Sequence, residues 1–224
     1  MGSHQSLAPY IDAYGQSIAA SFPGKIQSDA DLVAAAAYEQ EKLAQWGLPS
    51  GYDAWGGVVK AGWSDTATGF FHVKQRNGVW WLISPGGNPC FYIGLDNGPL
   101  TQGNNTPTSG RGWEFASVPP QTPPYDAAWS SGDWGNTGIA SVSFDTSNMI
   151  RKYGGGWQAT ATGLTVQRMK AWGFSGFGKW ATDAGSLPIM PVLYSGAPLL
   201  TRHEDIFDPS VEAQFTAEIG RAHV

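Results

Sequence analysis

Polar and aromatic side chains follow three apolar runs of the chain, at the points where these runs end. The runs are residues 90–96, 174–180 and 189–194. If they form parallel strands, the loops after them converge over one face, and residues there are candidates for binding or chemistry. The candidates are Asp96, Asn97, Lys179, Trp180, Asp183 and Tyr194. Each also has a structural interpretation: Asp96 could cap a loop, Lys179 could be a solvated charge, and Trp180 could pack at a rim.

The composition favours a carbohydrate ligand for these side chains. The 224 residues include 11 Trp, 8 Tyr, 10 Phe and 30 Gly. Tryptophan is normally scarce, and its flat apolar face suits the C–H face of a sugar ring. Many of these rings can equally fill cores, so the composition indicates a class of ligand and no particular sugar.

The glutamates do not supply a catalytic pair for cleaving a glycosidic bond. Cleavage with retention needs two carboxylic groups about 5 Å apart, one as acid and one as nucleophile. No glutamate ends a run that we interpret as a strand; they are Glu39, Glu41, Glu114, Glu204, Glu212 and Glu218. The sequence therefore predicts sugar-binding residues and no catalytic residues.

Other classes of site are not expected. His203, Glu204 and Asp205 are adjacent, and neighbours along a chain rarely point at one ion, so we predict no metal and no cofactor. The formal net charge of −5, from 13 basic and 18 acidic residues without runs, does not indicate a nucleic-acid surface. The sequence contains no stretch of about 18 apolar residues, so we expect no membrane partner. The single cysteine, Cys90, is interpreted as a small buried core residue. The oligomeric state is left open.

The elements that position these residues begin with an arm and a helix. Residues 1–27 show no sustained periodicity of apolar residues, which predicts an extended arm. Ser28 is a candidate N-cap for a helix that runs to residue 43, with Leu32, Ala36 and Leu43 on its apolar face. A loop is expected over residues 51–65.

Three short runs then predict a meander. They cover residues 70–75, 79–84 and 90–96, and Asn77-Gly78 is the preferred pair for a tight hairpin turn between the first two. The third run is almost wholly apolar over residues 91–95, which suits a strand buried on both faces. Residues 97–142 are rich in Gly, Pro, Ser, Thr and Asn, and we expect a long functional loop there.

The order of elements in the rest of the chain is typical of a parallel α/β fold. Helices are expected over residues 145–153 and 158–172, strands over 174–180 and 189–194, and a last helix from Asp208-Pro209. We therefore predict an incomplete (β/α)8 barrel of three or so strands, preceded by an arm, a helix and a hairpin. The boundary is placed between residues 1–69 and 70–224. The link over residues 180–189 is shorter than the dozen residues that a parallel crossover normally needs.

An ordered series of short segments resembles the β-agarase-like glycoside hydrolases. The segments include DAYGQ at residues 12–16, WWLISPGG at 80–87, FYIGL at 91–95, NMIRKYG at 148–154, RMKAWGF at 168–174 and FDP at 207–209. The resemblance implies a (β/α)8 barrel that hydrolyses β-glycosidic bonds of a galactan such as agarose, with paired glutamates on later strands. It implies a polysaccharide or oligosaccharide partner and a parent protein that is secreted or periplasmic. Ser175 and Lys179 stand where the family usually has asparagine.

The length of a barrel leads to a further expectation. Such a barrel needs about 250 residues, and only about 135 follow the start of the run at Cys90. We therefore expect the catalytic carboxylates to lie beyond Val224 and the chain alone to be inactive. Residues 218–224 also resemble one translated frame of a sequencing adapter. If the barrel is incomplete, its open apolar strand edges would promote aggregation of the chain.

The alternative function is a complete, non-catalytic carbohydrate-binding module. It would use exposed tryptophans, of which the candidates are Trp55, Trp113, Trp129 and Trp134. A module of this kind is normally an antiparallel sandwich, so strand topology separates the two hypotheses.

Overall fold

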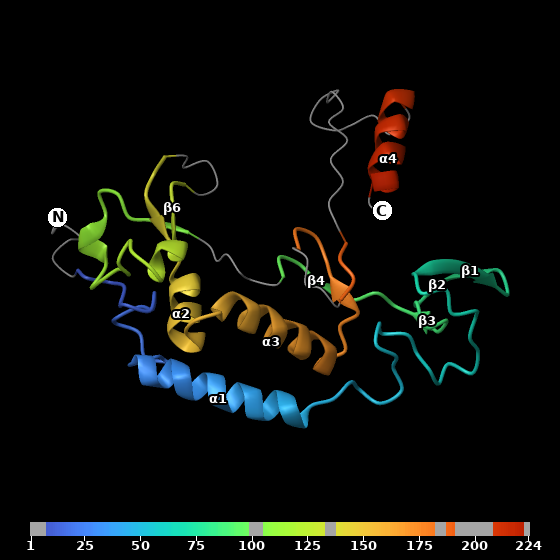
Figure 1. Cartoon of the computed structure of the whole chain (residues 1–224), viewed down its shortest axis with the longest axis horizontal. Coiled ribbons are helices and arrows are strands. Elements are labelled where there is room, and N and C mark those ends of the chain that lie inside the picture. Colours follow the sequence, from blue (N-terminus) through green and yellow to red (C-terminus); the bar gives the residue numbers. More distant parts are fainter. Residues whose placement is uncertain (1–7, 99–104, 133–137, 182–186, 191–207, 222–224) are drawn as a thin grey trace.

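The computed structural model describes residues 8–98, 105–132, 138–181, 187–190 and 208–221. The helices are α1 (Asp29–Gln45), α2 (Phe144–Tyr153), α3 (Trp157–Ala171) and α4 (Pro209–Arg221), with short 3-10 turns η2 (Gly112–Glu114) and η3 (Tyr125–Ala128). The strands are β1 (His72–Arg76), β2 (Val79–Ile83), β3 (Pro89–Cys90), β4 (Gly94–Leu95), β5 (Thr106–Pro107), β6 (Trp129–Ser130), β7 (Ser141–Val142) and β8 (Gly176–Phe177). Figure 1 shows α2 directly next to the sheet that contains β6, α1 running alongside α2 and α3, and the β1–β2 hairpin at the opposite end of the view.

Helix α1 forms as the sequence predicts. Ser28 lies in an extended conformation before it, and the Asp31 carboxylate accepts hydrogen bonds from the Ser28 and Gln27 amides at 2.9 and 2.8 Å. These bonds to two amides at the helix start lower the pKa of Asp31. Leu32, Ala36 and Leu43 are its buried residues, on the face that packs toward α2 and α3. The predicted apolar face is confirmed.

The hairpin also forms as predicted, at the turn that its sequence favours. Asn77 and Gly78 have φ of 52° and 79°, which is the left-handed pair of a tight hairpin turn. β1 and β2 pair antiparallel from His72 opposite Ile83 to Arg76 opposite Val79, and β3 adds to the other edge of β2.

The prediction of one buried strand over residues 90–96 is wrong. The run is divided between two sheets: β3 pairs with the hairpin, and β4 pairs in parallel with β8. Between them Phe91 is 81% exposed and Ile93 is exposed as well, and so is Leu95 within β4. The change of partner explains the difference, because the backbone at residues 91–93 bonds to Ser175 instead of continuing in either sheet.

The parallel sheet is short. Helices α2 and α3 lie in the segment that connects its two strands, β4 and β8. β4 pairs with β8 at Gly94 opposite Gly176, and Phe177 makes a further parallel bridge to Ile189. The amide of Phe177 donates to the carbonyl of Pro188 at 2.8 Å, so the short link after residue 180 still returns the chain in parallel. Residues 191–194 of the predicted third strand lie outside the described residues. Phe177 is fully buried with Val166, Met169 and Leu187 in one core cluster.

Residues 97–142 are not a structureless loop in the parts that the structure describes. β5, β7 and β6 make a three-stranded antiparallel sheet in that order. Its core is formed by Phe115, Val142 and Phe144, and Ile11 of the N-terminal arm packs against it. Strands of two residues carry no sequence period, which is why the pattern favoured a loop.

Helix α4 begins at the predicted cap. The Asp208 carboxylate accepts hydrogen bonds from the Ser210 hydroxyl at 2.7 Å and the Ser210 amide at 2.8 Å, and these bonds lower the pKa of Asp208. Pro209 occupies the first helical position, where its missing N–H has no intrahelical partner to lose.

Asp53 ties the loop before the hairpin to the turn after it. Burial alone would raise the pKa of Asp53, but bonds from the Ser84 hydroxyl at 2.6 Å, the Asn88 amide group and two backbone amides outweigh it and lower that pKa. Stability contributed by such a carboxylate is fully present above its unfolded pKa of about 3.9 and is lost as the pH falls through the lower folded pKa.

We therefore expect Ser84→Ala to destabilise the protein by about 1.5 kcal/mol near neutral pH, since it removes a hydrogen bond to a charged group. The difference from the parent chain should shrink at pH values below the unfolded pKa. Urea unfolding of both chains at neutral and acidic pH measures this, and a difference that does not change with pH would contradict the role given to Asp53.

Candidate functional site

The carboxyl ends of β4 and β8 bring four of the six candidate residues together. The amide of Lys179 donates to Asp96 Oδ1 at 2.8 Å, and the amide of Asn97 donates to the carbonyl of Lys179 at 3.0 Å. Trp180 follows directly. The other two candidates, Asp183 and Tyr194, lie outside the described residues. Two loops that are more than 80 residues apart in sequence are thus held by two hydrogen bonds just beyond the parallel pair.

The backbone at this place is strained. Asn97 has φ of 57° and Trp180 has φ of 59°, whereas the other described non-glycine residue with positive φ, Asn77, lies in the hairpin turn. Asparagine tolerates this conformation, but for a bulky aromatic residue it costs on the order of 1–3 kcal/mol. Such strain persists where the surrounding structure enforces it, and it is concentrated at binding and catalytic sites.

The side chains here combine a flat ring with polar groups. Trp180 is 49% exposed, and Lys179 Nζ lies 4.0 Å from the centroid of its ring. Asp96 and Asn97 are exposed on the neighbouring loop. Asp96 uses one carboxylate oxygen to hold the Lys179 amide, so it caps the loop that presents the ring. An exposed ring beside carboxylate and amide groups is a suitable surface for a sugar, which offers a C–H face and hydroxyls.

A hollow of about 480 Å³ adjoins the loop after β4. It is lined by Leu95, Asp96, Asn97, Gly98, Thr165, Arg168, Met169 and Trp172. The loop after β4 forms one side of it and the last turns of α3 the other. Its volume lies within the range of small-ligand sites, which is about 300–1,000 Å³.

Ser175 lies at the other end of β8 from the candidate site. Its side chain donates to the carbonyl of Phe91 and accepts from the amide of Ile93, both at 3.3 Å, and it is 1% exposed. It therefore positions the entry to β4 and does not reach the site.

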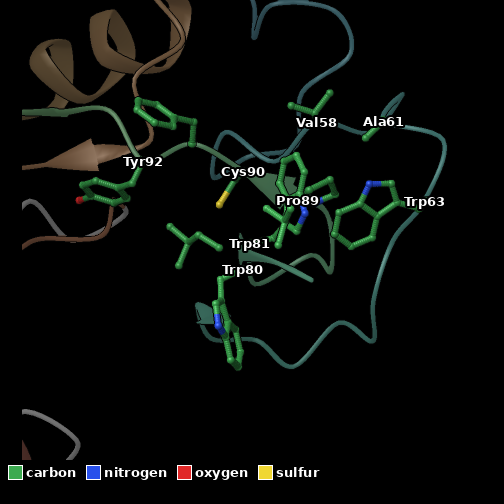
Figure 2. A pocket seen from close by; sticks show the side chains of 11 residues that line it. Val58, Ala61, Trp63, Trp80, Trp81, Pro89, Cys90 and Tyr92 are labelled. Carbon is green, nitrogen blue, oxygen red and sulfur yellow. The ribbon is translucent and has the colours of Figure 1, made fainter. Parts of the chain in front are cut away.

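A second, aromatic hollow was not anticipated as a site. Figure 2 shows it beside the hairpin, with Trp63, Trp80, Trp81 and Tyr92 around it. Its volume is about 610 Å³, and Trp80 in its wall is 66% exposed. Phe91 and Tyr92 lie before β4, so this hollow is at the amino end of the parallel strands, opposite to Asp96. The Trp80-Trp81 pair beside the Asn77-Gly78 turn was the available sequence signal.

Cys90 also lines the aromatic hollow, and its surroundings disfavour the reactive thiolate form of its side chain. Burial, with a smaller contribution from the nearby Asp53 charge, raises the pKa of Cys90 to about 11. The thiol therefore stays protonated near neutral pH. The interpretation of Cys90 as a buried residue is confirmed.

The tryptophans considered for a binding module are placed differently from one another. Trp129 donates from Nε1 to the carbonyl of Pro119 at 3.1 Å and packs against the small core, so its ring is not a free stacking surface. Trp113 lies edge-on to Tyr10, with ring centroids 5.8 Å apart. Trp55 is partly buried, and Trp134 lies outside the described residues.

None of the described glutamates follows a strand of the parallel sheet. Glu39 and Glu41 are on α1, Glu212 is on α4, and Glu114 pairs with Arg111 at 2.6 Å. Within the described ranges no group of three or more His, Cys, Asp or Glu side chains could hold a metal ion, and His203, Glu204 and Asp205 fall outside them. None of the described helices combines the length and apolar character needed to span a bilayer.

Relatives of the chain are agarases. It is 28% identical over 198 residues to β-agarase B, and 26% identical over 203 residues to β-agarase A, both of Vibrio sp. (strain JT0107). These matches cover 76% and 81% of this chain but only 20% and 19% of the relatives. No protein-family model matches the chain. The resemblance to β-agarase-like glycoside hydrolases is confirmed.

The fold is that of part of a solved agarase. The crystal structure of an agarase, AgWH50C, matches 99% of this chain with a TM-score of 0.74 at 24% identity, and the match covers 36% of that chain. The mixed helix and sheet fold is therefore shared with it. The chain spans about a fifth of the length of its curated relatives.

Proposed function

We propose that the chain is part of a glycoside hydrolase that cleaves β-glycosidic bonds of a galactan such as agarose, and that it supplies part of the sugar-binding face. The observation that carries this proposal is the exposed Trp180 ring, held in a strained backbone beside Asp96 and Asn97 at the carboxyl ends of two parallel strands. The similarity to two β-agarases supports the substrate class.

The architecture in this proposal is the first part of a (β/α)8 barrel. β4, β8 and the segment at residues 187–190 would be its first three strands, with residues 1–69 packed against a barrel region over residues 70–224. The crossover through α2 and α3 between β4 and β8 supports this assignment, because parallel neighbours need such a connection. The chain alone is expected to bind and not to hydrolyse, since no described glutamate ends a strand.

Affinity electrophoresis in gels that contain agarose tests the proposal. We expect the parent chain to be retarded and Trp180→Ala to bind about two- to tenfold more weakly, the loss typical of one aromatic contact. A parent chain that migrates equally with and without agarose would refute the proposed function. Release of oligosaccharides by the chain alone would refute its inactivity.

The aromatic hollow supports a second candidate function, non-catalytic carbohydrate binding. Trp80 is exposed there, as a stacking residue of a binding module would be. Trp80→Ala is therefore the matched variant in the same gels. Loss of retardation in Trp80→Ala with none in Trp180→Ala would favour the binding-module function over the barrel site.

A further inference from the structure

Lys179 is fixed in the middle of the candidate site. Its amide is held by Asp96 Oδ1 and its carbonyl by the amide of Asn97, so its backbone position is determined from both sides. Its side chain extends over the neighbouring Trp180 ring, with Nζ 4.0 Å from the ring centroid. The backbone that carries this cation is therefore fixed by the same loops that present the ring.

The ammonium group has no carboxylate partner in the part of the chain that the structure describes. By contrast, Lys74 pairs with Asp65 at 3.4 Å and Lys152 pairs with Glu39 at 3.0 Å. The Asp96 carboxylate lies on the adjoining loop but binds the Lys179 amide. A contact between an exposed cation and a ring is weak. A ligand anion could thus pair with Lys179 without breaking an ion pair to any of the described residues.

The negative net charge of the molecule does not itself favour binding of an anionic polysaccharide. The formal net charge is −5, so the long-range field repels an anionic polymer. Any preference of this chain for an anionic over a neutral polysaccharide must then come from a local group that faces the ligand.

We propose that Lys179 and Trp180 form a subsite for a galactan that carries a sulfate ester, with the ring contacting the sugar and the ammonium pairing with the sulfate. This inference rests on the proposed function and makes it more specific. A lysine is well suited to the task, because its ammonium is a compact point charge on a flexible stem.

Affinity electrophoresis with two forms of one polymer tests the inference. The probes are agarose and the same agarose after chemical sulfation, and the variants are Lys179→Gln, Lys179→Arg and Lys60→Gln, the last an exposed lysine in the loop before the hairpin. We expect the parent chain to bind the sulfated polymer about two- to fivefold more tightly, the range for one exposed ion pair. High salt should abolish this preference, because it screens exposed charges.

Lys179→Gln should remove the preference, measured within this variant as the ratio of its binding to sulfated and to unmodified agarose, so that any change in binding of unmodified agarose is divided out. Lys179→Arg and Lys60→Gln should keep it. Equal binding of both polymers by the parent chain, or a preference that survives in Lys179→Gln or falls equally in Lys60→Gln, would overturn the subsite and leave the proposed function standing. Binding of neither polymer would overturn both.

Discussion

Replacing Gly176 by alanine is expected to destabilise the protein by about 2–3 kcal/mol, as overpacking of a well-packed core does. A Cβ at this position of β8 would lie 2.5 Å from the carbonyl oxygen of Pro188 and even closer to the Tyr92 hydroxyl. Neither neighbour can move freely. The Pro188 carbonyl accepts from the Phe177 amide, and the Tyr92 hydroxyl donates to the Phe177 carbonyl, both at 2.8 Å. The added methyl group would therefore clash with Tyr92 and Pro188, which are both hydrogen-bonded to Phe177.

Gly163→Ala is the matched control for this substitution. Gly163 lies inside α3, and a Cβ there would meet nothing within 4 Å. Alanine favours a helix interior over glycine, so this variant should be more stable than the parent chain by up to about 1 kcal/mol. Urea unfolding followed by circular dichroism measures both. If Gly176→Ala unfolds at the same urea concentration as the parent, the close packing described at β8 does not hold.

Elements with local signals were predictable from the sequence. Ser28 and the alanine-rich run after it predict α1, and Asn77-Gly78 predicts the hairpin, because cap and turn geometries are properties of a few neighbouring residues. Helix α3 ends close to its predicted end, where Gly173 has φ of 79°.

Elements that depend on distant partners were not predictable. Residues 91–95 are apolar throughout, and the pattern gives no sign that the chain leaves one sheet after Cys90 and enters another at Gly94. The exposed Phe91 follows from that change of partner. The β5–β7–β6 sheet is equally non-local, since its strands of two residues have neither a period nor a distinctive composition.

The residues of the candidate site can be selected from the sequence, but their geometry cannot. The rule that loops converge at the carboxyl ends of parallel strands selects Asp96, Asn97, Lys179 and Trp180. It does not give the left-handed backbone at Trp180, which a propensity argument would disfavour for an aromatic residue. Nor does it give the bond from the Lys179 amide to Asp96, because that bond requires β4 and β8 to be in one register.

Glu39→Gln is expected to cost about 2–3 kcal/mol of stability, somewhat less than for a fully buried ion pair. The Glu39 carboxylate is 16% exposed and accepts from Lys152 Nζ and the Tyr153 hydroxyl, each at 3.0 Å, as well as from the Arg168 guanidinium. It thus joins α1 to α2 and α3. The Arg168 side chain is only 24% exposed, and this burial lowers its pKa. A neutral amide would leave two cations without a counter-charge.

Glu41→Gln on the same helix separates this effect from a change in helix propensity. Glu41 is exposed and accepts a hydrogen bond from the Gln45 side chain at 3.2 Å, so its substitution should change stability by less than about 0.5 kcal/mol. Urea unfolding compares the two variants, and hydrogen exchange of the α1 amides should quicken in Glu39→Gln only. Equal stability of the two variants would mean that apolar packing through Leu32, Ala36 and Leu43 holds α1 in place without help from the ion cluster.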